Sequence, residues 1–162
     1  SIISKKKNMK EVKITSKGAN YSAVNIGKME DLREYTLKLG PDKEMPGKVF
    51  IGSSICATGA EISFQSFLPG EGNAFIHAHK THEEMYIIIK GEGEYQVDGN
   101  IFPISEGSVV RISPVGKRAI RNTGKDNMVM ICIQYKANSF GAEDTPHNDG
   151  TIIHEELKWD KD

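Results

Sequence analysis

Residues 77–84 read HAHKTHEE and hold three of the chain's five histidines, directly followed by two glutamates. Because His77 and His79 are one residue apart, a strand would point both imidazoles to the same face. Glu84 and Tyr86 alternate in the same way on the next apolar run. Two imidazoles and a carboxylate that converge from adjacent strands suit Fe(II), Mn(II), Ni(II) or Zn(II). The stretch therefore indicates a 2-His-1-carboxylate metal site, with a solvated polar turn as the alternative.

Two further residues of this stretch compete for a role at the site. His82 lies on the connecting turn and would be an extra ligand if that turn folds inward, whereas an exposed position is the alternative. Glu83 competes with Glu84 as the carboxylate ligand. Strand parity with Tyr86 and the six-residue gap to Gly91 favour Glu84.

The elements that must position these residues are strands. Between residues 48 and 136 the chain is a series of short runs rich in Val, Ile, Phe and Tyr, separated by Gly, Pro, Asn and Asp. Asp98-Gly99 lies between two such runs and carries a β-hairpin signal. No run here has the 3.6-residue periodicity of a helix. The pattern predicts an all-β fold, an antiparallel barrel or sandwich of about eight or nine strands.

The segments on either side of this region differ from it in composition. Residues 1–47 are mixed and polar, and we expect a leader followed by an arm that packs on the main body or pairs with a second subunit. Within the arm, residues 29–37 could form one or two helical turns. Residues 137–162 are turn-rich and polar, and we expect them to form a tail that packs on the barrel, anchored by Trp159.

Length and charge narrow the class of protein. The 162 residues suit one domain, and a net charge of -1 favours neither nucleic acid nor an anionic membrane as a partner. We interpret Cys56 and Cys132, which lie in apolar runs, as buried small hydrophobic residues. No stretch reaches the roughly 20 apolar residues that span a bilayer, and the N-terminus lacks a signal-peptide core. A cytoplasmic location is the default expectation.

The histidine-rich stretch resembles the first motif of the cupin superfamily, G-x5-H-x-H-x3–4-E-x6-G. Residues 70–91 read GEGNAFIHAHKTHEEMYIIIKG, so His77, His79 and Glu84 match the ligands and Gly91 matches the closing glycine. The leading glycine is displaced by one position. The resemblance, to small single-domain members with the cupin_2-like conserved barrel, implies an antiparallel β-barrel or jelly roll with a divalent transition metal on these three residues.

The second cupin motif, G-x5-P-x-G-x2-H-x3-N, resembles this sequence at Gly107, Pro114, Gly116 and Asn122 but not at its histidine. Residues 107–122 read GSVVRISPVGKRAIRN, with one extra residue before the proline and one missing before the asparagine. The fourth ligand, a histidine, is absent. Counting from Gly116 places Ala119 in its position, whereas counting back from Asn122 places Arg118 there. Ala119 would leave an open coordination position, whereas Arg118 could form an ion pair with Glu84 or bind an anionic group of a ligand.

Other polar residues on strand-like runs are candidates for a ligand pocket; these are Gln65, Tyr86, Arg118 and Gln134. The resemblance implies a small-molecule-binding protein with a divalent metal, in a superfamily that includes oxygenases, isomerases and decarboxylases acting on small polar molecules such as sugars or carboxylates. The alternative is a non-catalytic ligand-binding module with a degraded or empty metal site and Arg118 near the pocket. A homodimer is expected, because the arm would protect sheet edges.

Overall fold

The structure is a computed structural model that describes residues 9–160. It is composed mainly of β-strands, as the sequence predicted. The N-terminal elements are β1 (Lys13–Gly18), β2 (Tyr21–Asn25), the 3-10 helix η1 (Met29–Glu34), β3 (Thr36–Gly40) and β4 (Lys43–Pro46). The central elements are β5 (Lys48–Phe50), β6 (Glu61–Phe67), β7 (His82–Lys90), β8 (Glu92–Val97), β9 (Asn100–Ser105), β10 (Val109–Ile112), β11 (Arg118–Asn122) and β12 (Met128–Lys136). Of the predicted helical segment, η1 forms the first part.

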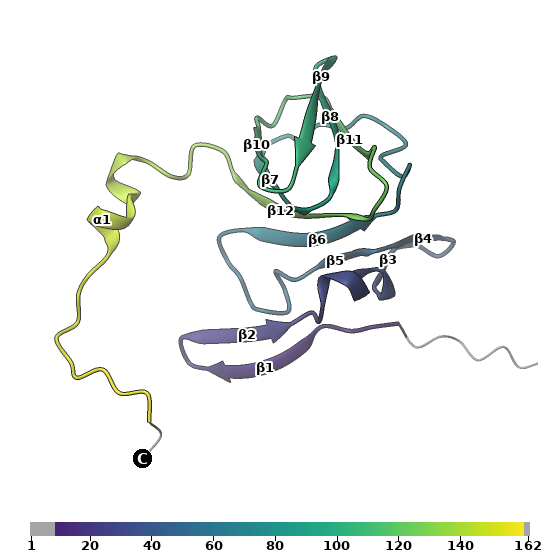
Figure 1. Cartoon of the computed structure of the whole chain (residues 1–162). Helices are drawn as coiled ribbons and strands as arrows, with labels where there is room; N and C mark the ends of the chain where they lie inside the picture. Colours follow the sequence, from purple (N-terminus) through teal and green to yellow (C-terminus); the bar gives the residue numbers. More distant parts are fainter. Residues whose placement is uncertain (1–8, 161–162) are drawn as a thin grey trace, which may run out of the picture.

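The central strands form two antiparallel sheets that face each other (Figure 1). One sheet has five strands in the order β10-β7-β12-β6-β5, and the other has three in the order β11-β8-β9. Buried side chains from both sheets meet between them in one core cluster, which includes Phe67, Tyr86, Tyr95, Ile120 and Met128. This arrangement is the all-β barrel that the sequence predicted.

Strand β7 lies inside the five-stranded sheet, between β10 and β12, and shows how the sequence selects the two faces of that sheet. Its side chains alternate in burial along the strand. Glu84, Tyr86 and Ile88 point toward the three-stranded sheet, whereas Ile89 packs on the other side with a second apolar cluster. The period of two along a strand therefore puts Glu84 and Tyr86 in the barrel interior.

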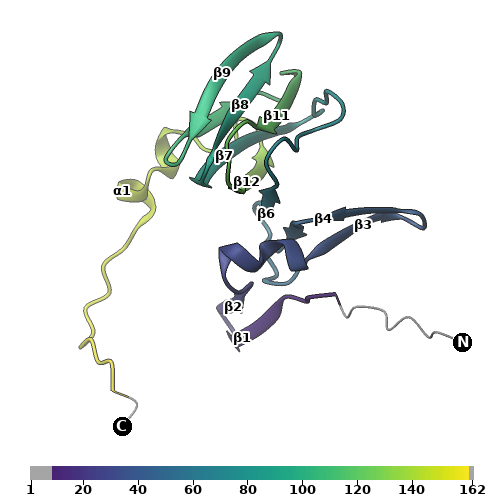
Figure 2. The ribbon, with the colours of Figure 1, turned by 45° about the vertical axis from the view of Figure 1, so that its right-hand side comes forward.

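The N-terminal arm covers the outer face of the five-stranded sheet. Its residues Ile26, Leu32 and Tyr35 form a second core cluster with Ile51 and Val129. Hairpins β1–β2 and β3–β4 flank η1 on this side of the molecule (Figure 2). The arm thus packs on the main body, which was one of the two arrangements expected from the sequence.

The turn between β8 and β9 shows how a local signal fixes register. Asp98 and Gly99 have φ angles of 51° and 83°, and Val97 pairs with Asn100 across the turn. Two consecutive residues with positive φ match the twist of a tight hairpin, which is why Asp-Gly is favoured there. The hairpin predicted from this dipeptide is confirmed.

The C-terminal tail differs from the prediction. After β12 it contains only the short elements η2 (Ala142–Asp144) and α1 (Pro146–Asp149), and it extends away from the barrel in both views (Figures 1 and 2). Its apolar side chains are exposed, Trp159 by 87% and Ile152 by 81%. The prediction that the tail packs on the barrel through Trp159 is therefore wrong for the single chain, because no contact buries these side chains. The boundaries of arm, barrel and tail stay a prediction.

Two smaller expectations are also decided by the structure. Cys132 is buried as expected, but Cys56 is exposed, because it lies in the turns after β5 instead of in a strand. Both cysteines are free thiols. Across residues 9–160, no helix has the length and apolar character needed to cross a membrane.

Candidate metal centre and ligand site

The residues of the predicted metal site come together at one end of the barrel interior. Glu84 lies on β7, where Gln134 of β12 and Ile112 of β10 flank it. His77 and His79 lie on the segment between β6 and β7. The expectation that they share a strand is only partly met, since His77 forms a single β-bridge with Arg118. The backbone of His79 is held separately, with its N–H donating to the carbonyl of Pro114 at 2.8 Å.

The three predicted ligands converge closely. Ligand atoms of His77, His79 and Glu84 all lie within 4.8 Å of one another, so the group could hold a metal ion. Nε2 of His79 is 3.1 Å from Oε1 of Glu84, and Nε2 of His77 is 4.0 Å from the same oxygen. The histidine side chains are 35% and 25% exposed, whereas Glu84 is 2% exposed. The cluster therefore opens to solvent on its histidine side.

Several donors hold the Glu84 carboxylate from within the barrel. Tyr86 Oη donates to Oε1 at 2.8 Å, and Cys132 Sγ donates to Oε2 at 3.0 Å. Burial acts to raise the pKa of Glu84, but the bonds from Cys132 and Tyr86 and the charges of His79 and Arg118 outweigh it. The pKa of Glu84 therefore lies below its ordinary value, and the group is an ionised carboxylate at neutral pH.

Arg118 occupies the position next to this carboxylate. Its guanidinium Nη1 donates to Oε1 of Glu84 at 2.5 Å, and its side chain is 0% exposed. The other nitrogens donate to backbone carbonyls of Gly116, Ser113 and Pro114. Ala119 points away, toward the face of the three-stranded sheet that Glu94 and Gln96 line. Between the two alternatives for the missing histidine, the geometry thus favours Arg118.

His77 is held in its neutral form by its surroundings. Burial lowers its pKa below the ordinary 6.5, and the charges of His79, Arg118 and Lys48 act in the same direction, against an opposing effect of Glu84. A neutral imidazole is the form that can bind a metal ion. At neutral pH, His77 is therefore in the form that could hold a metal ion.

This lowered pKa predicts a pH dependence of stability. The unfolded chain binds a proton at His77 near pH 6.5 while the folded chain does not, so folding stability falls as the pH drops below about 6.5. Urea unfolding at a series of pH values measures this slope. We expect His77→Gln to reduce it and His147→Gln, in the exposed tail, to leave it unchanged. Equal slopes in wild type and His77→Gln would contradict the assignment.

The remaining sequence candidates lie at different distances from the cluster. His82 begins β7 and stays outside the metal-ligand group, because its Nδ1 lies 3.1 Å from Oε1 of Gln134 in a hydrogen bond. Gln65 is buried on the inner face and donates to Met45 Sδ at 3.6 Å. Glu83 turns outward, where it pairs with Arg111 at 2.8 Å. The preference for Glu84 over Glu83 agrees with this geometry.

Sequence reasoning missed Lys48. It lies on β5, opposite Gln65 of β6, and so shares the inner face with Tyr86 and Cys132. Burial lowers its pKa, whereas Cys132 and Glu84 act to raise it. The signal was weak, because Lys48 opens an apolar run and looks like a polar strand end until the pairing of β5 with β6 is known.

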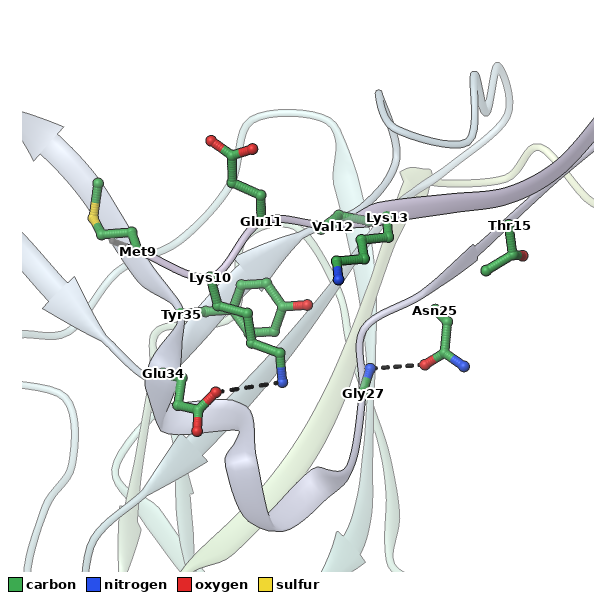
Figure 3. A pocket seen from close by; sticks show the side chains of 10 residues that line it. All are labelled: Met9, Lys10, Glu11, Val12, Lys13, Thr15, Asn25, Gly27, Glu34 and Tyr35. Atoms are coloured by element: carbon green, nitrogen blue, oxygen red, sulfur yellow. Dashed lines mark hydrogen bonds and ion pairs between the residues drawn. The ribbon is translucent and has the colours of Figure 1, made fainter. Parts of the chain in front are cut away.

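A separate hollow of about 1100 Å³ lies at the N-terminal arm, far along the chain from the histidines (Figure 3). Two of its charged groups, Lys10 and Glu34, form an ion pair. Lys10 Nζ lies 3.7 Å from Glu34 and 5.2 Å from the centre of the Tyr35 ring, and Gly27 N donates to Asn25 at 2.8 Å. Among the residues that the structure describes, this hollow has no cluster of metal-ligating groups, so the His–Glu cluster is the better candidate site.

Comparison with known proteins identifies the family. A family model described as "Cupin domain" matches residues 63–134. A solved cupin protein (BF4112) from Bacteroides fragilis is 33% identical, with a TM-score of 0.60 over 72% of this chain and 94% of that chain. The protein TT1209 from Thermus thermophilus is 15% identical, with a TM-score of 0.51 over 68% and 95% of the two chains, which supports the fold alone.

Among curated proteins, the uncharacterized protein MJ1618 from Methanocaldococcus jannaschii is 30% identical over 81 residues. That match covers 50% of this chain and 63% of the relative, so the chain spans less than two thirds of its length. The Bacteroides protein, in contrast, is matched over 94% of its length. On this combined similarity of sequence and fold, the chain belongs to the cupin superfamily.

Proposed function

We propose that this cupin binds a small polar molecule at a divalent transition-metal centre held by His77, His79 and Glu84. The observation that supports it is the convergence of three suitable donor atoms within 4.8 Å, on a cluster that is open on its histidine side. This donor set leaves coordination positions for a ligand or water. A bound metal would supply Lewis-acid or oxygen-binding chemistry there.

The surrounding residues would prepare these ligands for binding. Arg118, Tyr86 and Cys132 hold the Glu84 carboxylate in place through hydrogen bonds to its two oxygens. Such contacts fix the orientation of a ligating group and so reduce the entropy that is lost on binding. The β-bridge between His77 and Arg118 keeps both sides of the site in register.

Metal content tests this function directly. Protein purified without added metal should contain about one equivalent of Fe, Mn, Ni or Zn by elemental analysis. We expect the double variant His77→Ala/His79→Ala to lose that metal while its circular dichroism spectrum stays that of a folded β-protein. His82→Ala is the matched control, because His82 lies on the same stretch but outside the cluster. Metal retained by the double variant would count against the proposed ligands.

A second candidate function rests on a different observation, the buried ion pair of Arg118 and Glu84. An ion would have to share Oε1 of Glu84 with Arg118 and Tyr86, and the guanidinium charge would oppose a second cation. This contact favours a non-catalytic module that holds its ligand without metal. Full ligand affinity in rigorously metal-free protein would select this alternative.

The homodimer and the cytoplasmic location stay predictions. The exposed apolar side chains of the tail, including Ile153 and Leu157, would suit burial against a second copy. The exposed hairpin β3–β4 could likewise contribute a sheet edge.

A further inference from the structure

The inner face of the five-stranded sheet carries a second cation besides Arg118. Lys48 lies opposite Gln65, and its strand neighbour Phe50 lies opposite Ser63, which in turn pairs with Cys132. Val49, between them, packs with the outer cluster. The alternation along β5 therefore directs Lys48 into the barrel, on the same face as Tyr86 and Glu84.

The ammonium group of Lys48 has an apolar neighbour but no anionic partner. Its Nζ lies 5.0 Å from the centre of the Phe50 ring. Within residues 9–160, no carboxylate oxygen lies within 4.0 Å of it, and no hydrogen bond to a side chain satisfies it. A partly buried ammonium without a counterion costs solvation free energy, which a bound anion would restore.

Lys48 adds a positive charge near the His–Glu cluster. Glu84 and Arg118 already form an ion pair at 2.5 Å, so Lys48 is a second cation beside that pair. A divalent ion at the histidines would add two more positive charges. This positive potential favours the binding of an anion over the binding of a neutral molecule.

We propose that Lys48 binds the carboxylate group of the ligand, so that this cupin takes a small carboxylate instead of a neutral sugar. The inference rests on the proposed function in placing the ligand at the His–Glu cluster. The ammonium would donate a charge-assisted hydrogen bond to a carboxylate oxygen, with the open side of His77 and His79 receiving the rest of the molecule. Arg118 would not share this contact, since its nitrogens already bond Glu84 and three backbone carbonyls.

Calorimetry with paired probes tests the inference. Lactate and lactamide, or malonate and malonamide, have the same skeletons and differ in charge. Each probe is titrated into wild type, Lys48→Met, Lys48→Arg and the control Lys43→Met, whose lysine is exposed on β4. All titrations are run on zinc-loaded and on chelator-treated protein, and circular dichroism verifies that each variant is folded.

We expect the wild type to bind each carboxylate at least about tenfold more tightly than its amide. Lys48→Met should lose most of that preference, whereas Lys48→Arg and Lys43→Met should keep it. Equal affinity for acid and amide in wild type, or a preference that survives in Lys48→Met, would overturn the inference, as would wild type that binds neither probe pair. A Lys48-dependent preference in protein that binds none of Fe, Mn, Ni and Zn would support it while refuting the metal centre.

Discussion

Replacing Arg118 with methionine is expected to destabilise the metal-free protein by about 3–5 kcal/mol. The reason is the environment of Glu84, which is 2% exposed and is paired with the permanently charged Arg118. Its hydrogen bonds from Tyr86 and Cys132 come from uncharged groups. Without the guanidinium, a buried carboxylate must either stay charged in a medium of low dielectric constant or take up a proton. Urea unfolding in the presence of a chelator measures the loss.

The control for this variant is available on the same strand. Arg121→Met also breaks an arginine–glutamate contact, with Glu94, but that arginine side chain is 63% exposed. A surface pair contributes about 0–1 kcal/mol, so this variant should be close to wild type. Equal losses in Arg118→Met and Arg121→Met would contradict the claim that burial gives the Arg118–Glu84 pair its weight.

Two additions separate the charge from the loss of packing. Zinc in excess should recover part of the stability of Arg118→Met, because a cation at His77 and His79 would replace the missing charge beside Glu84. The double variant Glu84→Gln/Arg118→Met should be more stable than Arg118→Met alone in chelator, because no unpaired charge stays buried. If the double variant is the less stable one, an unpaired Glu84 charge is not what destabilises Arg118→Met.

The grouping of His77, His79 and Glu84 could be anticipated from the sequence because part of its geometry depends on short-range periodicity. The period of two along β7 puts Glu84 and Tyr86 on one face and Glu83 on the other, as observed. The spacing of His77 and His79 was also informative, although they lie outside a regular strand. Their positions depend on contacts with Arg118 and Pro114 that are distant in the sequence.

The missing histidine could not be assigned by counting, because the second motif is shifted by one residue on each side of the glycine. The signal that decides it is the alternation within β11. Arg118, Ile120 and Asn122 are buried, and Ala119 and Arg121 are less so. Arg118 lies two residues before the buried Ile120, so strand alternation already indicated that its side chain points inward. A buried arginine needs a partner of opposite charge, which is Glu84 here.

Lys48 and the two terminal segments could not be placed in this way. The side chain of Lys48 points inward because of the register in which β5 pairs with β6. The sequence of the loop between these two strands does not determine that register. The tail was expected to pack because of its apolar residues, yet composition does not say which surface covers Trp159. The arm packs because the outer face of the five-stranded sheet is apolar and must be covered.

Leu32→Ala is expected to cost about 2–5 kcal/mol of unfolding free energy, although Leu32 lies in the arm and far from the His–Glu cluster. Leu32 is 0% exposed and packs from η1 against the cluster that contains Val129 of β12. Truncation would leave a cavity that neighbouring elements cannot easily fill, because Arg33 bonds Ser66 O at 2.8 Å and Tyr35 O accepts from Gly47 N at 2.7 Å.

The matched control for this variant is Leu39→Ala. Leu39 belongs to the same arm but is 51% exposed on β3, so its truncation should change stability by less than about 0.5 kcal/mol. Urea unfolding of both variants, monitored by circular dichroism, gives the two values. One cooperative transition with a large loss in Leu32→Ala would make the arm part of the folding unit. An effect as small as that of Leu39→Ala would instead mean that the arm contributes little to stability and that the barrel's outer face is covered in another way.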